Sequence, residues 1–210
     1  MSLEIVTLVL GPLANNTYLV SDRKTGDTAV IDPSLGSQEV LDTVRKRGWN
    51  LCQIWLTHAH FDHTAGVQLI ASSQSPSIPV SLHRLDLPLY RDSGGAKKFG
   101  FTIQPGPEPS HFLEDGLILA LGDSHLEIRF TPGHTPGHVV IYAPDEDVVF
   151  CGDVIFRGSI GRTDLPGGSY QQLLNSIQTQ ILSLPPQTRL LSGHGPETTV
   201  ATEISINPYL

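Results

Sequence analysis

Four residues whose side chains bind metals fall within six positions of this chain, in the pattern His58-x-His60-x-Asp62-His63. They follow a nearly continuous apolar run over 51–56, which is typical of a strand buried on both faces. Alternate residues of an extended segment share a face, so His58 and His60 can point toward one ion. Asp62 and His63 come where we expect the chain to turn into a helix. The pattern therefore predicts two neighbouring metal ions, each served by one pair.

Three further candidate ligands each follow a predicted strand and lie beside a glycine or in a glycine-rich turn: His134, Asp153 and His194. Glycine lets the backbone approach closely, so these side chains can reach a shared pocket. We expect Asp153 to bridge the two ions. The ligands of the first ion are then His58, His60 and His134, and those of the second are Asp62, His63 and His194.

Imidazole and carboxylate donors without a thiolate suit zinc, iron or manganese and do not select among them. Two divalent ions about 3.5–4 Å apart hold a water between them, lower its pKa and polarise a carbonyl or phosphoryl oxygen. These residues therefore predict a metal-dependent hydrolase.

The whole series, from the His-x-His-x-Asp-His motif to His134, Asp153 and His194 in that order, resembles the metallo-β-lactamase superfamily. The resemblance covers essentially the entire chain. It implies an α/β (α+β) fold, a four-layer αββα sandwich of two mixed sheets with helices outside and the metals at one sheet edge. We accordingly expect one domain over residues 1–210.

Within the superfamily, the segments 156–164 and 192–199 and the ending Asn207-Pro208 are similar to short glyoxalase II-like hydrolases. The similarity implies hydrolysis of a thioester such as S-lactoylglutathione by a metal-bridging hydroxide, which Asp62 helps to orient. Two zinc ions are the expected cofactors, with iron or manganese as alternatives. Full-length glyoxalase II carries a C-terminal helical domain that contacts glutathione. Only residues 195–210 follow His194 here, so we expect that domain to be missing, and glutathione as the thiol carrier stays open.

Two other activities share this motif set. Persulfide dioxygenases, which are oxidoreductases, resemble the chain in length and in the stretch Gly161 to Asp164, and hold one iron with counterparts of His58, His134 and Asp153. A true β-lactamase is the second alternative. The commonest secreted forms have a cysteine where this chain has Asp153, and the N-terminus does not resemble a signal peptide.

Four cations are candidates for binding a carboxylate-bearing substrate: Lys97, Lys98, Arg157 and Arg162. The two lysines fall in 91–110, a stretch rich in glycine and proline that we expect to be a long exposed loop. A solvated loop face is the alternative for the lysines, and an ion pair with Asp164 is the alternative for Arg162.

The remaining histidines and the cysteines have simpler interpretations. We expect His138 to orient a ligand or cap the pocket. We expect ordinary packed or surface positions for His83, His111 and His125, and core positions for Cys52 and Cys151.

Composition excludes some partners. The chain has 13 Lys and Arg against 21 Asp and Glu, a formal net charge of −8, so we expect no nucleic-acid partner. No apolar stretch approaches the roughly 20 residues that span a bilayer, so we expect no membrane partner. Two cysteines far apart favour a cytoplasmic protein without disulfides. The expected partner is a small-molecule thioester, with glutathione as one possible carrier.

Short apolar and β-branched runs separated by turn residues predict the elements that position these ligands. The expected strands are 5–10, 17–21, 28–31, 51–56, 78–82, 117–121, 125–130, 138–143, 148–150 and 189–191. The expected helices are 37–47, 64–72, 170–184 and 199–204.

Overall fold

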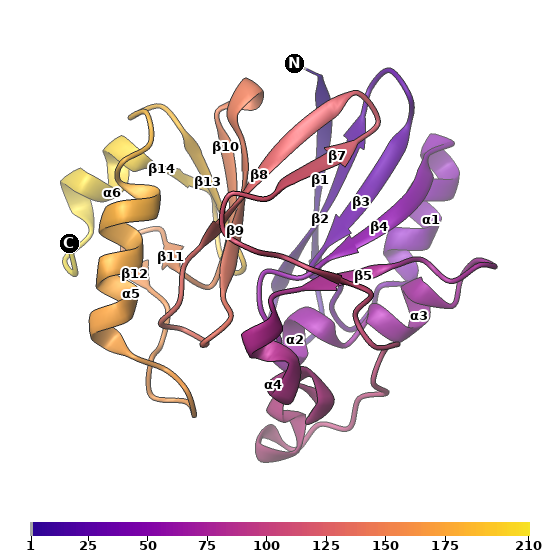
Figure 1. Cartoon of the computed structure of the whole chain (residues 1–210), viewed down its shortest axis with the longest axis horizontal. Helices are drawn as coiled ribbons and strands as arrows, with labels where there is room; N and C mark the ends of the chain where they lie inside the picture. Colours follow the sequence, from indigo (N-terminus) through magenta and orange to yellow (C-terminus); the bar gives the residue numbers. More distant parts are fainter. Residues whose placement is uncertain (1) are drawn as a thin grey trace.

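Two six-stranded sheets face each other in the computed structural model of the chain, which describes residues 2–210 (Figure 1). Their strand orders are β1-β2-β3-β4-β5-β6 and β14-β13-β10-β9-β8-β7. Both sheets are mixed, because β3 to β6 run parallel and β10 pairs in parallel with β13, whereas the other pairs are antiparallel. The first sheet comprises β1(Leu3–Leu10), β2(Asn15–Asp22), β3(Asp27–Ile31), β4(Asn50–Trp55), β5(Val80–Leu82) and β6(His111–Phe112). The second comprises β7(Ile118–Leu121), β8(Ser124–Phe130), β9(Val139–Ala143), β10(Val148–Gly152), β13(Arg189–Ser192) and β14(Thr198–Thr199).

Helices cover the outer face of each sheet (Figure 1). α1(Gln38–Arg47) and α3(Val67–Ala71) pack on the first sheet, and α5(Tyr170–Ser176) and α6(Val200–Ile206) pack on the second. The structure thus has the expected four layers, helix–sheet–sheet–helix. A two-stranded hairpin, β11(Ile155–Phe156) and β12(Ser159–Ile160), follows β10 and was not predicted.

Side chains that alternate along the strands form three apolar clusters, one between the sheets and one between each sheet and its helices. Ile31 of β3 points into the space between the sheets, whereas its neighbour Val30 packs toward the helices of the first sheet. In the same way Phe150 of β10 faces the space between the sheets and Cys151 faces α5 and α6. Successive strand side chains point to opposite faces, so strands covered on both sides must be apolar throughout. Cys151 is fully buried, as expected, and Cys52 is half-buried.

Two predicted segments differ from the structure. The helix expected over 64–72 is broken into α2(Phe61–Thr64) and α3, because the Gly66 amide donates to the Pro33 carbonyl and not to the preceding turn. The stretch 91–110 is not a loop throughout, since it begins with the end of α4(Leu87–Arg91) and the 3-10 helix η2(Ser93–Phe99).

Gly94 explains why the sequence pattern does not indicate a helix at residues 93–99. Its φ of 61° interrupts the helical periodicity, and a side chain there would lie 2.3 Å from the Phe61 amide nitrogen. The segment is therefore pressed against α2 at a position where only glycine fits. The opening part of 91–110 is consequently a packed wall beside the histidine motif, and Gly94, Gly95 and Ala96 are buried.

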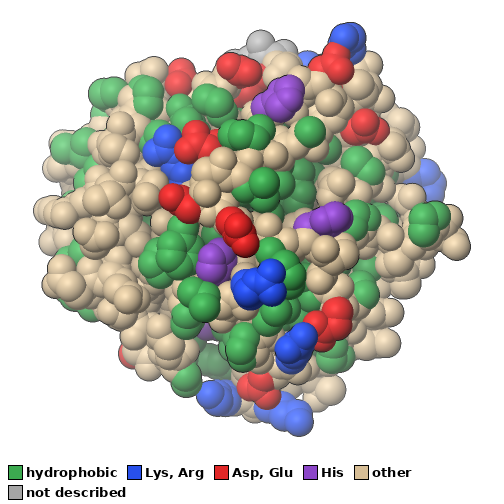
Figure 2. All heavy atoms as spheres, in the orientation of Figure 1, with side chains coloured by type: hydrophobic (Ala, Val, Ile, Leu, Met, Phe, Trp, Pro, Cys, Tyr) green, Lys and Arg blue, Asp and Glu red, His purple; other side chains and the backbone are tan. Residues whose placement is uncertain are grey.

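The face drawn in Figure 2 has hydrophobic, histidine, basic and acidic side chains mixed at its centre, where the two halves of Figure 1 meet. No helix among residues 2–210 is long and apolar enough to cross a membrane.

Asp22 links the two sheets away from the candidate ligands. The carboxylate, at the end of β2, accepts hydrogen bonds from the hydroxyl of Ser124, which begins β8, at 2.6 Å and from the amide of Asp123, which precedes it, at 3.2 Å. Burial would raise the pKa of Asp22, but the hydrogen bonds from Ser124, Thr25 and Lys24 outweigh it and lower the pKa to about 2. The ionised form is therefore the one that the fold stabilises.

We predict that Asp22→Ala lowers the free energy of unfolding by about 1–3 kcal/mol, because it leaves the buried Ser124 hydroxyl without its acceptor. Because the folded pKa is lowered, the contribution is fully present above pH 3.8 and is lost as the pH falls toward 2. Urea unfolding at neutral pH measures the effect. Asp42→Ala, on the exposed face of α1, is the control and should change stability by less than about 1 kcal/mol. Equal effects of the two variants would contradict this role.

Candidate metal centre

The candidate ligands all follow strand ends at one edge of the two sheets. His58, His60, Asp62 and His63 follow β4 and lead into α2. The other sheet supplies His134 from the β8–β9 connection, Asp153 after β10 and His194 after β13. All seven side chains, far apart in the sequence, converge as the spacing predicted. Both sheets contribute to the cluster.

The first predicted triad is buried and its nitrogens converge. His60 Nδ1 lies 2.8 Å from His134 Nε2. The His58 ring lies 4.9 Å from the His60 ring and 4.8 Å from the His134 ring, measured between centroids. One donor atom from each of the three residues fits within a 4.8 Å span. Nε2 of His58 is buried and has no hydrogen-bond partner. Buried polar atoms normally have one, so this nitrogen is free to bind a cation.

The second predicted triad lies beside the first and is more open. His194 Nε2 is 3.2 Å from Asp62 Oδ2, and His63 Nε2 is 3.7 Å from the same oxygen. His63 is fully buried, whereas Asp62 and His194 are partly exposed and line a cavity of about 260 Å³. This set combines two imidazoles with one carboxylate, a donor set that suits several divalent metals.

Asp153 lies between the two triads. Its Oδ2 is 3.6 Å from His134 Nε2 in the first triad and 3.7 Å from His194 Nε2 in the second. Its Oδ1 is 3.4 Å from His63 Nε2 and is buried without a hydrogen-bond partner. Together with the unpartnered nitrogen of His58, this oxygen shows that the residues fit a pair of cations.

Hydrogen bonds fix the tautomer of His58. The Thr57 hydroxyl donates to Asp32 Oδ2 at 2.6 Å, so at 3.0 Å it can only accept a proton from His58 Nδ1. The hydrogen of His58 therefore resides on Nδ1, and the lone pair of Nε2 faces the cluster. A bound metal requires this arrangement.

Three other histidines are oriented in the same way. Nδ1 of His63 donates to Asp32 Oδ2 at 2.9 Å. Nδ1 of His134 donates to the Arg162 carbonyl at 2.7 Å, and Nδ1 of His194 donates to the Leu13 carbonyl at 3.1 Å. Carboxylate and carbonyl oxygens can only accept, so each Nδ1 carries a hydrogen and each Nε2 is the nitrogen that faces the cluster. The Nε2 of His63 also lies 3.1 Å from the Asn15 amide nitrogen.

Burial and neighbouring charges set the pKa values. Burial, reinforced by the other histidines, holds the pKa of His58 well below its usual range, and burial with His134 beside it lowers that of His60 to about 3. Burial opposes ionisation of Asp153, but His63 outweighs it and lowers the pKa of the carboxyl. His58 and His60 are therefore neutral and Asp153 is ionised near pH 7, which are the forms that ligate metals.

Two buried carboxylates that no sequence pattern revealed, Asp32 and Asp86, hold the ligands in place. Asp32 could itself group with His58 and His63 around an ion, but its oxygens already accept from Thr57 and His63. Asp86 accepts from the Ala59 and Gly137 amides and from the Thr135 hydroxyl, and so ties the two histidine loops together. A single acid after a strand gives no spacing signal by which it could have been found.

His138 orients Asp153, which agrees with its expected supporting role. Its Nε2 accepts from the Asp153 amide at 3.1 Å, and its Nδ1 is 3.1 Å from the Thr131 hydroxyl. Close approach around Asp153 also explains Gly193, because a side chain there would lie 2.3 Å from Asp153 Oδ1. The glycine beside His194 is thus required by the carboxylate, as the sequence pattern suggested.

The four predicted substrate-binding cations are distributed unevenly. Arg162 lines the cavity over the second triad, and its guanidinium also pairs with Asp164 through two contacts of 2.7 Å. Lys98 lines a neighbouring cavity, described below. Lys97 and Arg157 are exposed and line neither of these cavities. Of the other histidines, His83 stacks on Phe130, and His111 and His125 are exposed.

Residues 10–194 match the family model described as the metallo-beta-lactamase superfamily, and the chain belongs to that family. It is 40% identical to the probable metallo-hydrolase YqgX of Bacillus subtilis (strain 168), over 96% of this chain and 94% of that protein. It is 32% identical to the hydroxyacylglutathione hydrolase GloC of Haemophilus influenzae (strain ATCC 51907 / DSM 11121 / KW20 / Rd), over 100% of this chain and 98% of that protein. The family and these relatives support a metal-dependent hydrolase.

Solved structures agree with the fold. BLEG-1 B3 metallo-beta-lactamase superposes with a TM-score of 0.92 at 36% identity, covering 99% of both chains. TTHA1623 in a di-iron-bound form superposes with a TM-score of 0.89 at 41% identity, covering 98% of this chain and 100% of the other. The neighbours confirm the metallo-β-lactamase sandwich, and with the histidine–aspartate cluster they indicate divalent metal ions without fixing which metal.

We predict that Asp32→Ala weakens metal binding about 10–100-fold, because His63 and the Thr57–His58 pair lose the acceptor that fixes their ring orientation. Competition with a chelator of known affinity, followed by metal analysis, measures the change. Asp42→Ala on α1 is the matched control and should bind metal as the wild type does. Unchanged affinity in Asp32→Ala would show that the ligands are held by other contacts.

Proposed function

We propose that the seven ligands hold two divalent ions and that the protein hydrolyses acyl-thioesters such as S-lactoylglutathione. The observation that carries this proposal is the pair of adjacent triads with Asp153 between them, open to a cavity of about 260 Å³. The likeness to the hydroxyacylglutathione hydrolase GloC supports the thioester as substrate. The binding partner that we propose is therefore a small-molecule substrate.

Each triad has a defined part in this proposal. His58, His60 and His134 would hold one ion, Asp62, His63 and His194 the other, and Asp153 both. When bound, such ions supply Lewis acidity toward a carbonyl oxygen and lower the pKa of a water molecule; zinc is the metal that we propose. Iron is supported by the di-iron form of TTHA1623.

The protein's own residues position the reactants. Asp62 lines the cavity and its carboxylate can accept a hydrogen bond from the attacking water. Leu13 and Phe99, two apolar side chains with 46% and 43% exposure, lie at the rim of the same cavity and would exclude bulk water once a substrate covers them. A thiol has a pKa of about 8.5, so a thiolate can leave without a dedicated general acid.

We predict that His58→Ala abolishes turnover of S-lactoylglutathione and lowers the metal content of the purified protein. His58 is fully buried, and its loss leaves the first triad with two nitrogens. Loss of thioester absorbance measures the rate, and metal analysis of the same sample gives the occupancy. His125→Ala, at an exposed position on β8, is the control and should retain both. A wild-type protein with its metals bound and no thioester turnover would overturn the proposal.

A second candidate is β-lactam hydrolysis, which the likeness to BLEG-1 favours. Both reactions begin with attack of water on a carbonyl carbon, so the same centre suits either. The ratio of kcat/KM for S-lactoylglutathione to that for a chromogenic cephalosporin decides between them. One iron per chain with oxygen consumption on a persulfide substrate would instead establish the dioxygenase.

A further inference from the structure

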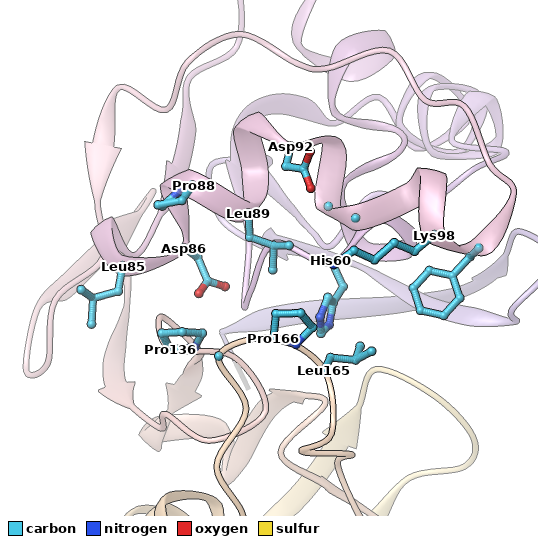
Figure 3. Close-up of a pocket in the computed structure, with 14 residues that line it drawn as sticks. His60, Leu85, Asp86, Pro88, Leu89, Asp92, Lys98, Pro136, Leu165 and Pro166 are labelled. Atoms are coloured by element: carbon cyan, nitrogen blue, oxygen red, sulfur yellow. The ribbon is translucent and has the colours of Figure 1, made fainter.

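A second cavity adjoins the one over the metal centre. Its volume is about 390 Å³, and His60, Phe99 and Leu165 line both this cavity and its neighbour, so the two lie side by side. Figure 3 shows Leu89, Asp92 and Lys98 on one side and Pro136, Leu165 and Pro166 on the opposite side, with His60 between. A molecule that reacts at the centre can therefore extend into this second space.

The walls of this second cavity are apolar and poor in hydrogen-bond donors. Three of its lining residues are prolines, which have no backbone N–H. Three more are leucines. These six residues are Leu85, Pro88, Leu89, Pro136, Leu165 and Pro166. Such a surface binds hydrocarbon and offers little to a carbohydrate, an amide or a carboxylate.

The charged residues that line the cavity do not change this conclusion. Asp86 is fully buried, and its carboxylate is occupied by the Ala59 amide, the Thr135 hydroxyl and the Gly137 amide. Asp92 and Lys98 are exposed and of opposite charge, so they belong to the rim. Asp86 therefore presents no unsatisfied charge to the interior, and the charges of Asp92 and Lys98 are accessible to solvent.

The volume sets the size of the occupant. An apolar cavity of about 150 Å³ already holds benzene, and 390 Å³ is well within the range of about 300–1,000 Å³ for small-molecule sites. A lactoyl group, with three carbons and a hydroxyl, would leave most of this space empty. The cavity has room for a chain of about six carbons or an aromatic ring.

The acyl group and the thiol carrier of a thioester differ in charge, and so in how well each fits this apolar cavity. A thiol carrier such as glutathione bears carboxylates and an ammonium group, whose desolvation against prolines and leucines is costly. An acyl chain carries no charge and gains from burial. Arg162, at the other cavity, lies where a carboxylate of the carrier could be met.

We infer that the cavity bounded by Leu85, Leu89 and Leu165 is an acyl-chain site, and that the enzyme prefers thioesters of apolar acyl groups of about four to eight carbons over the lactoyl group. This inference rests on the proposed thioesterase function and specifies its substrate class. No reaction step is added, because the site only binds the part of the substrate that lies beyond the carbonyl carbon.

Hydrolysis of an S-acylglutathione series by the metal-loaded protein tests the inference. We expect kcat/KM to rise about threefold for each methylene added between acetyl and hexanoyl, because each is buried in the cavity. Leu89→Trp and, as a second filling variant, Leu165→Trp should each reduce the hexanoyl-to-acetyl ratio about tenfold or more. Leu69→Trp, at an exposed position on α3 away from both cavities, is the control and should leave the ratio unchanged. A flat series in the wild type would overturn the acyl-chain site while leaving thioester hydrolysis in place.

Binding of thioethers, which cannot be hydrolysed, separates the two proposals. We expect S-hexylglutathione to bind at least about tenfold more tightly than S-methylglutathione, and the difference to shrink in Leu89→Trp. This preference without hydrolysis of any thioester would retain the apolar site and overturn the proposed function. Equal affinity of the two thioethers would overturn the site.

Discussion

Five imidazole rings and two carboxylates are packed at one edge of two sheets, with nitrogen and oxygen atoms of six of the seven residues as close as 2.8–3.7 Å to one another. Without cations, such an arrangement is electrostatically unfavourable, because buried polar groups require partners and His58 Nε2 and Asp153 Oδ1 have none. The rest of the site serves to hold these groups in place against that cost. Two divalent ions would satisfy every one of the converging atoms.

The supporting contacts come from the backbone as much as from side chains. His134 and His194 donate to main-chain carbonyls, whereas Asp32 serves His63 directly and His58 through Thr57. Each contact ties the tautomer of a ring to the position of a strand or loop. The chemistry of the centre therefore depends on the relative placement of the two sheets, which the apolar interface between them maintains.

The sequence predicted the convergence of the seven candidate ligands because they obey local rules. Alternation placed His58 and His60 on one side of an extended segment, and strand ends beside glycine marked His134, Asp153 and His194. The sandwich followed from the family resemblance. Asp32 and Asp86 could not be found in this way, because their roles depend on contacts across the fold. The helical segment 87–99 was also missed, since Pro88 and the glycine pair Gly94-Gly95 mask its helical turns. The same segment lines the acyl-chain site that we infer. The substrate preference that we propose therefore follows from the shape of the cavity and not from a sequence motif.

The origin of the ligands has a thermodynamic consequence. One sheet supplies four of the seven side chains and the other supplies three, so a bound pair of ions cross-links the two halves of the sandwich. A ligand that binds only the folded state stabilises it by an amount that grows with its free concentration, about 2.7 kcal/mol at one hundred times Kd. If the proposed ions bind, the stability of the folded protein would therefore depend on the free metal concentration in its surroundings. Metal starvation would reduce not only the rate of the reaction but also the amount of protein that survives to perform it.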